Sequence, residues 1–136
     1  MSSYVTKKTL GDTEWFRKDR FGMFIHWGLY AMPARNEWIK HIECITDEKY
    51  DKYFKYFNPD LYDAKEWAKK AKEAGMKYAV LTTKHHDGFC MWDTKYTDYN
   101  IMNTPYGKDV IKMLADIPQQ AETLLRSMLR RLEQRA

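Results

Sequence analysis

Three histidines are the side chains of this sequence best suited to chemistry at a ligand. His85 and His86 stand side by side ahead of Asp87, and His26 lies earlier in a similar apolar context. An imidazole donates a hydrogen bond from one ring nitrogen and accepts one at the other, which suits the hydroxyl groups of a polyhydroxy ligand. We therefore take the histidines as candidate ligand-binding residues.

Glu37 and Trp38 are a second candidate pair. A carboxylate can accept hydrogen bonds from two adjacent hydroxyls, and an indole can cover the apolar face of a pyranose ring. A neighbouring charged and aromatic residue is common in loops, so the pair gains meaning only beside the histidines.

Two other uses of the histidines stay open. Together with Asp87 or Glu37 they could ligate a metal, but adjacent histidines at a strand end are expected to point to opposite sides and cannot easily face one ion. They could also be core histidines that hydrogen-bond to the backbone. We favour hydrogen bonding to a ligand and predict no metal site.

Two strands are expected to position these side chains. Residues 22–27 form an apolar run with His26 near its carboxyl end. Residues 76–83 form an apolar, β-branched run, and only Lys84 separates it from the His85–His86 pair. Ligands of α/β folds bind at the carboxyl ends of parallel strands. Asp87 and Gly88 supply the turn that leaves the second strand.

The segments between and after the strands alternate between loop and helix. We expect a loop over residues 29–40, a helix over 46–57 capped by Thr46, a helix over 64–74 capped by Asp63 and stopped at Gly75, an irregular loop over 94–107 and a helix that opens at residue 108. This order predicts an α/β fold with a parallel sheet.

Composition excludes several classes. The 136 residues suit one compact domain, and the net charge of +4 is spread along the chain without the basic stripe of a nucleic-acid protein. No apolar run could span a membrane, and the N-terminus lacks a secretory signal. The two cysteines have no metal-binding or disulfide spacing. We expect a cytoplasmic protein.

Four motifs together resemble the α-L-fucosidases of glycoside hydrolase family 29. They are residues 21–30 (FGMFIHWGLY), residues 37–38 (EW), residues 82–90 (TTKHHDGFC) and residues 95–100 (KYTDYN). The likeness extends from about residue 15 to residue 115. Four motifs in this order are specific to that family.

The resemblance implies a (β/α)8 TIM-like barrel and a retaining glycosidase that removes terminal α-L-fucose from a fucosylated oligosaccharide or glycoside. It implies no cofactor. In that family the matching positions hold the fucose, namely those of His26, Glu37, Trp38, His85 and His86. The nucleophile and the acid/base stand on later strands, so we assign no catalytic residue in this chain.

A (β/α)8 barrel takes roughly 250 residues, and this sequence supplies about two strand–helix units. We expect residues 1–115 to be the N-terminal part of a truncated catalytic barrel. Residues 116–136 form an Arg-rich amphipathic helical stretch that we expect to be foreign to the family, through truncation, a frameshift or an engineered end.

Such a chain is expected to be inactive alone and to need a second chain that carries the rest of the barrel. The alternatives are a non-catalytic fucose- or carbohydrate-binding fragment and an interaction module that uses the basic C-terminal helix. We expect neither nucleic acid nor a membrane as a partner.

Overall fold

The centre of the fold is a parallel pair of short strands. The computed structural model describes residues 14–117, in which β1 (Gly22–Ile25) and β2 (Tyr78–Leu81) pair in register from Gly22 opposite Tyr78 to Ile25 opposite Leu81. Both strands are shorter than the expected runs, but the α/β class and the parallel pairing are confirmed.

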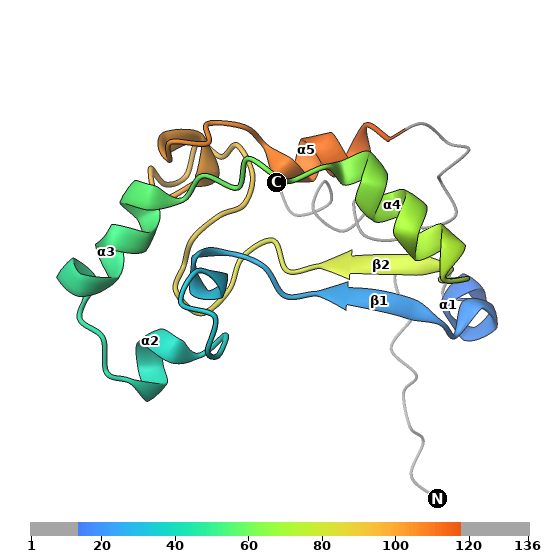
Figure 1. Ribbon diagram of the computed structural model, residues 1–136, viewed down its shortest axis with the longest axis horizontal. Helices are drawn as coiled ribbons and strands as arrows, with labels where there is room; N and C mark the ends of the chain where they lie inside the picture. Colours follow the sequence, from blue (N-terminus) through green and yellow to red (C-terminus); the bar gives the residue numbers. More distant parts are fainter. Residues whose placement is uncertain (1–13, 118–136) are drawn as a thin grey trace, which may run out of the picture.

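Short helices lie over one face of the sheet and beyond both ends of its strands (Figure 1). They are α1 (Glu14–Asp19), α2 (Ile39–Ile42), α3 (Asp47–Tyr56), α4 (Ala64–Glu73) and α5 (Val110–Ala115), with 3-10 turns η1 (Leu29–Ala31) and η2 (Ile101–Asn103). Helices α4 and α5 lie over one face of the sheet, and α2 and α3 lie beyond the ends toward which both strands point. None of these helices is long and apolar enough to cross a membrane.

Helix α4 begins and ends where its sequence signals place it. The Asp63 carboxylate accepts hydrogen bonds from the backbone N–H groups of Lys65 and Glu66 at 2.8 and 3.1 Å. After the helix, Gly75 adopts a φ of +78°, the left-handed conformation that glycine takes without strain. Alanines on one side of α4 are buried, so the helix packs closely on the strands.

The other segments follow the expectations less closely. Thr46 occupies the N-cap position of α3 but makes no side-chain capping hydrogen bond. The last described helix begins at Val110 and is capped by Asp109, whose carboxylate accepts from the N–H of Lys112 at 2.8 Å. The expected loop over residues 29–40 contains η1 and the start of α2, which are too short to leave a periodic pattern.

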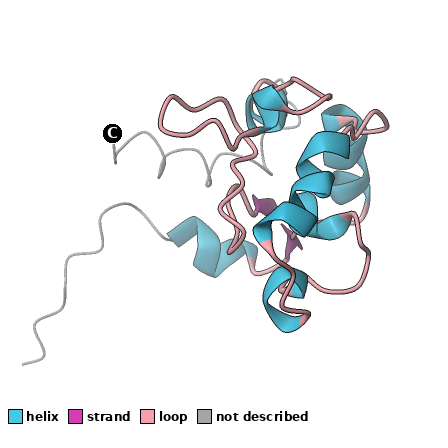
Figure 2. Cartoon of the chain, turned by 90° about the vertical axis from the view of Figure 1, so that its left-hand side faces the viewer, coloured by secondary structure: helices cyan, strands magenta, loops and turns pink. Residues whose placement is uncertain are grey.

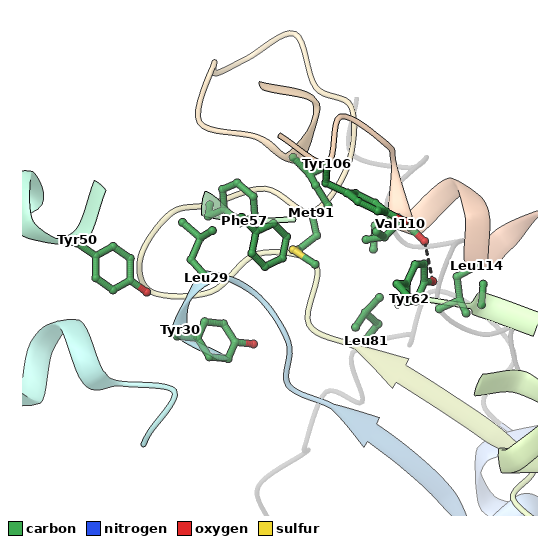
Figure 3. Packing of buried hydrophobic residues seen from close by; sticks show 14 of the residues in the cluster. Leu29, Tyr30, Tyr50, Phe57, Tyr62, Leu81, Met91, Tyr106, Val110 and Leu114 are labelled. Carbon is green, nitrogen blue, oxygen red and sulfur yellow. Dashed lines mark hydrogen bonds between the residues drawn. The ribbon is translucent and has the colours of Figure 1, made fainter. Parts of the chain in front are cut away.

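The hydrophobic core lies between the helix-covered face of the sheet and the loops at the carboxyl ends of the strands. Figure 3 shows Leu29, Phe57 and Met91 packed at its middle. The Tyr62 hydroxyl crosses the core and donates to the backbone oxygen of Val110 at 3.2 Å. This hydrogen bond joins the segment ahead of α4 to α5.

Within residues 14–117, little packs on the opposite face of the sheet. Phe24 projects from this face and remains 64% exposed, although an aromatic strand residue normally packs against a neighbour. The Tyr78 ring covers Gly22 on the same face and contacts Trp15 and Phe16 of α1 at centroid distances of 5.7 and 5.4 Å. The expected helical stretch from Pro118 onward lies outside the described residues.

Candidate functional site

His26 stands immediately after β1, as the sequence predicts. Its neighbour Trp27 is anchored between Tyr62 and Trp67, at ring-centroid distances of 4.9 and 5.2 Å. The backbone on both sides of His26 is thus held by strand pairing and by this aromatic cluster. The His26 side chain itself is exposed at the end of the sheet.

His85 and His86 lie in a tight turn after β2 and not in the strand. The base of this turn is closed where the N–H of Met91 donates to the oxygen of Thr83 at 2.9 Å. Within it, the N–H of Gly88 donates to the oxygen of His85 at 3.0 Å, and Gly88 has a φ of +82°. The expected Asp–Gly turn is confirmed.

Asp87 supports the turn from inside. One carboxylate oxygen accepts a hydrogen bond from the N–H of Phe89 at 3.1 Å, and the other accepts from the Tyr50 hydroxyl at 3.0 Å. Burial, followed by the charge of Asp87, raises the pKa of Tyr50 well above its ordinary value. Tyr50 therefore stays a neutral donor, and Asp87 is engaged by protein groups.

Trp38 is presented by its own loop. The side-chain oxygen of Asn36 accepts a hydrogen bond from the N–H of Trp38 at 2.7 Å, which fixes the start of α2. Arg35 and Glu43 form a two-pronged ion pair of 2.7 and 2.8 Å across the same loop. The Trp38 indole remains 41% exposed and offers an apolar surface to solvent.

The rings of both loops meet at the carboxyl ends of the strands, the end of the molecule that faces the viewer in Figure 2. The Trp38 ring lies 3.4 Å from that of His86 and 6.0 Å from that of His85, and the His85 ring lies 5.9 Å from that of His26. The expectation that the adjacent histidines point to opposite sides is wrong, because a turn and not a pleated strand orients them.

The electrostatic surroundings keep His85 neutral. Burial lowers the pKa of its imidazole, the cations that His86 and His26 would form lower it further, and the carboxylates of Asp87 and Glu37 oppose them. Glu37, the fifth predicted site residue, is exposed and lies near enough to His85 to act on its pKa, so all five lie in one region. A neutral imidazole offers a donor and an acceptor to a hydroxyl group.

One buried polar atom in this region, Nδ1 of His85, has no hydrogen-bond partner among the described residues. The ring of Tyr30 lies 4.5 Å from that of His85, and burial raises the pKa of Tyr30 to about 12, although the nearby Thr82 side chain opposes this shift. Both Nδ1 of His85 and the Tyr30 hydroxyl are inaccessible to solvent, so neither atom belongs to the exposed surface that a ligand would meet.

Tyr30 and Tyr50 were missed by the sequence reasoning. Tyr30 is the last residue of the motif over residues 21–30, so its position was a usable signal. Tyr50 lies on a helix that the sequence shows only as amphipathic, and nothing local points from it to Asp87. Within residues 14–117, no three histidine, cysteine, aspartate or glutamate side chains gather as a metal site would require.

Comparison with known proteins relates the chain to one family. The family model described as alpha-L-fucosidase matches residues 4–129. Human plasma alpha-L-fucosidase is 32% identical over 117 residues, which cover 74% of this chain and 25% of the relative.

Comparison with solved structures relates the chain to the same family. Alpha-L-fucosidase isoenzyme 1 from Paenibacillus thiaminolyticus is 60% identical, with a TM-score of 0.78 over 83% of this chain and 27% of that one. A family 29 alpha-L-fucosidase from Bacteroides thetaiotaomicron, trapped as a covalent intermediate with 2-fluoro-fucosyl fluoride, is 40% identical, with a TM-score of 0.78 over 89% of this chain and 30% of that one.

The chain spans about a quarter of the length of the curated relatives it matches. The matched residues 4–129 run past residue 115, where the sequence analysis placed the end of the family region. The assignment of residues 116–136 to a tail outside the family stays a prediction.

Proposed function

The chain belongs to the α-L-fucosidase family, and on this basis we propose that His26, Glu37, Trp38, His85 and His86 bind the fucose unit of a glycoside. The observation that carries the proposal is the meeting of both loops at the strand ends, with His85 5.9 Å from His26 and Trp38 3.4 Å from His86. The imidazoles would form hydrogen bonds with the sugar hydroxyls, and the indole would cover an apolar face of the ring.

The reaction proposed for the whole protein is retaining hydrolysis of terminal α-L-fucose. Retaining glycosidases form a covalent glycosyl–enzyme intermediate between two carboxyl groups about 5 Å apart, and the Bacteroides relative was trapped as a covalent intermediate. Asp87 does not suit either role, because Tyr50 and Phe89 already engage its two oxygens. We assign the nucleophile and the acid/base to segments other than residues 14–117.

Calorimetric titration of the 136-residue chain with L-fucose tests the binding proposal. We expect saturable heat from the native chain, its loss in His85→Ala and its retention in His41→Ala. His41 is the matched control because it is an exposed histidine on α2. Equal heats from the two variants would refute the assignment of His85, and absence of heat from a folded native chain would refute sugar binding.

The alternative is a carbohydrate-binding fragment without catalysis. The same geometry favours it, since the five proposed fucose-binding residues lie together, while the Asp87 carboxylate already accepts hydrogen bonds from Tyr50 and Phe89. Release of an aryl alcohol from an aryl α-L-fucoside by the purified chain, above the buffer rate, would exclude it. We propose that the chain alone releases none.

Cytoplasmic residence is a separate proposal, which cell fractionation would test.

A further inference from the structure

One long-range hydrogen bond ties the histidine turn to a helix distant in sequence. The Tyr50 hydroxyl of α3 donates to Asp87 at 3.0 Å across 37 positions of the chain. Tyr50 is 1% exposed, and its ring packs edge-to-face on Tyr53 at 5.2 Å, with the Lys40 ammonium 5.1 Å from its centroid. The donor is therefore held in place by its own surroundings, and Figure 3 shows its hydroxyl directed away from α3.

The acceptor end is equally well held. The second oxygen of Asp87 accepts from the N–H of Phe89 at 3.1 Å. The Phe89 ring is buried against Phe54 and Phe57 at 5.9 and 5.5 Å. Asp87 thus joins α3 to the turn, and His86 is the residue immediately before it.

We propose that Tyr50 is a positioning residue whose hydrogen bond to Asp87 fixes the turn and holds the His86 imidazole against Trp38. Tyr50 does not touch the ligand in this proposal and takes no part in the chemistry. Its effect on sugar binding rests on the proposed function, but its effect on the His86 ring does not.

The physical reason is the cost of an unpaired buried acceptor. Without the Tyr50 hydroxyl, the half-buried Asp87 carboxylate keeps only the Phe89 N–H and must turn toward water to be solvated. Movement of Asp87 moves the backbone of His86 with it. The centroid of the His86 ring lies 3.4 Å from that of Trp38, with the ring planes tilted by 32°. A displacement of about 1 Å or more would break this contact, because dispersion contacts weaken steeply with separation.

The NMR chemical shifts of the His86 ring protons report whether the ring remains against Trp38. Protons over an indole face are moved upfield by its ring current, and the chain has only 4 histidines to assign. In the full chain, Tyr50→Phe should bring the His86 ring protons most of the way to the shifts of an exposed histidine. Tyr56→Phe is the matched control, since it removes the same group from a 74% exposed tyrosine of the same helix.

Retention of the native His86 shifts in folded Tyr50→Phe would overturn the proposal. If circular dichroism shows that Tyr50→Phe does not fold, a second pair of variants tests the proposal. Asp87→Asn keeps an acceptor for Phe89 and offers an amide N–H to the Tyr50 oxygen, so it should preserve the stacked shifts. Asp87→Ala should lose them, and equal His86 shifts in these two variants would also overturn the proposal.

Fucose titration separates this proposal from the binding proposal. If both hold, Tyr50→Phe weakens fucose binding by roughly tenfold, equivalent to about 1.4 kcal/mol, and Tyr56→Phe leaves it unchanged. If the native chain does not bind fucose while Tyr50→Phe still releases His86 from Trp38, the binding proposal fails and the positioning role stands. If fucose binds and Tyr50→Phe changes neither affinity nor shifts, the positioning role fails.

Discussion

At the scale of single residues, His85 makes the stability of the chain depend on pH. Its pKa in the folded chain lies below the ordinary value, first because of burial and then because of the neighbouring His86. The unfolded chain therefore binds a proton at His85 before the folded chain does. Stability rises with pH wherever the unfolded state binds more protons.

We predict that lowering the pH from about 6.5 toward the depressed pKa of folded His85 destabilises the native chain. Well above a pH of about 6.5 both states hold a neutral His85, and this contribution is constant. His85→Gln should have a smaller loss of unfolding free energy over the same range, measured by urea titration at each pH. His41→Gln is the control, and parallel pH profiles of His85→Gln and the native chain would contradict the prediction.

Trp38 allows binding to be separated from folding. Its indole is 41% exposed and lies on His86 at 3.4 Å. We predict that Trp38→Ala changes the unfolding free energy by only about 1 kcal/mol, the range of an aromatic pair, but weakens L-fucose binding about tenfold or more. An unchanged dissociation constant by calorimetry would show that the indole does not cover the sugar.

The nearness of the five proposed site residues could be predicted, because His26, His85 and His86 follow strands, and Glu37 and Trp38 belong to the loop after the first strand. Their mutual arrangement was less predictable. The sequence predicted that His85 and His86 stand at a strand end and point to opposite sides. In the structure both belong to the turn that the hydrogen bond from the N–H of Gly88 to the oxygen of His85 closes, so the turn decides where both rings point. The Tyr50–Asp87 bond joins residues 37 positions apart, and such a contact leaves no local pattern.

At the scale of elements, helix α4 was predicted well because its signals are local. Asp63 caps its first turn through two backbone hydrogen bonds, and Gly75 ends it in a left-handed conformation. The shortening of both strands was not predictable, since strand ends depend on which neighbours pair. Helix α2 has only four residues, too few for helical periodicity to appear.

We predict that Asp63→Ala lowers the unfolding free energy by about 1 kcal/mol, the usual loss when an N-cap side chain is removed. The test is the urea midpoint, at unchanged slope. Asp60→Ala is a control, because Asp60 is also exposed and lies outside α4. Equal midpoints for the two variants would show that the cap does not stabilise the helix.

Gly22 is needed for the packing of Tyr78 across the strand pair. A Cβ at position 22 would overlap the Tyr78 ring, which is itself confined by Trp15 and Phe16. We predict that Gly22→Ala lowers the unfolding free energy by about 1–3 kcal/mol, as overpacking does. The double variant Gly22→Ala with Tyr78→Ala should recover part of the Gly22→Ala loss. An additive double variant in thermal denaturation would rule out this overlap.

At the scale of the whole molecule, the sheet has a covered face and an open face in the part of the chain that the structure describes. Helices α4 and α5 cover one side of the sheet, while Phe24 projects 64% exposed from the other. Unpaired strand edges and an exposed apolar face favour association with further strands. Unpaired strand edges are what the sequence leads us to expect, since two strand–helix units alone cannot close a barrel.

We predict that a separate polypeptide carrying the remaining barrel strands of a family relative restores fucosidase activity to the chain. Phe24 should become protected on assembly, and Phe24→Asp should prevent restoration. Phe21→Asp, at a 51% exposed position just outside β1, is the comparison. Activity restored alike with Phe24→Asp and the native chain would place the assembly surface elsewhere.

The central claim is that the histidines at the strand ends bind fucose, and their own resonances test it most directly. With histidines labelled, titration with L-fucose should shift the signals of His26, His85 and His86 along one saturable curve. The signal of His41 should not move, and D-fucose should have little effect. Equal shifts of all four histidines, or none in a folded chain, would contradict the account.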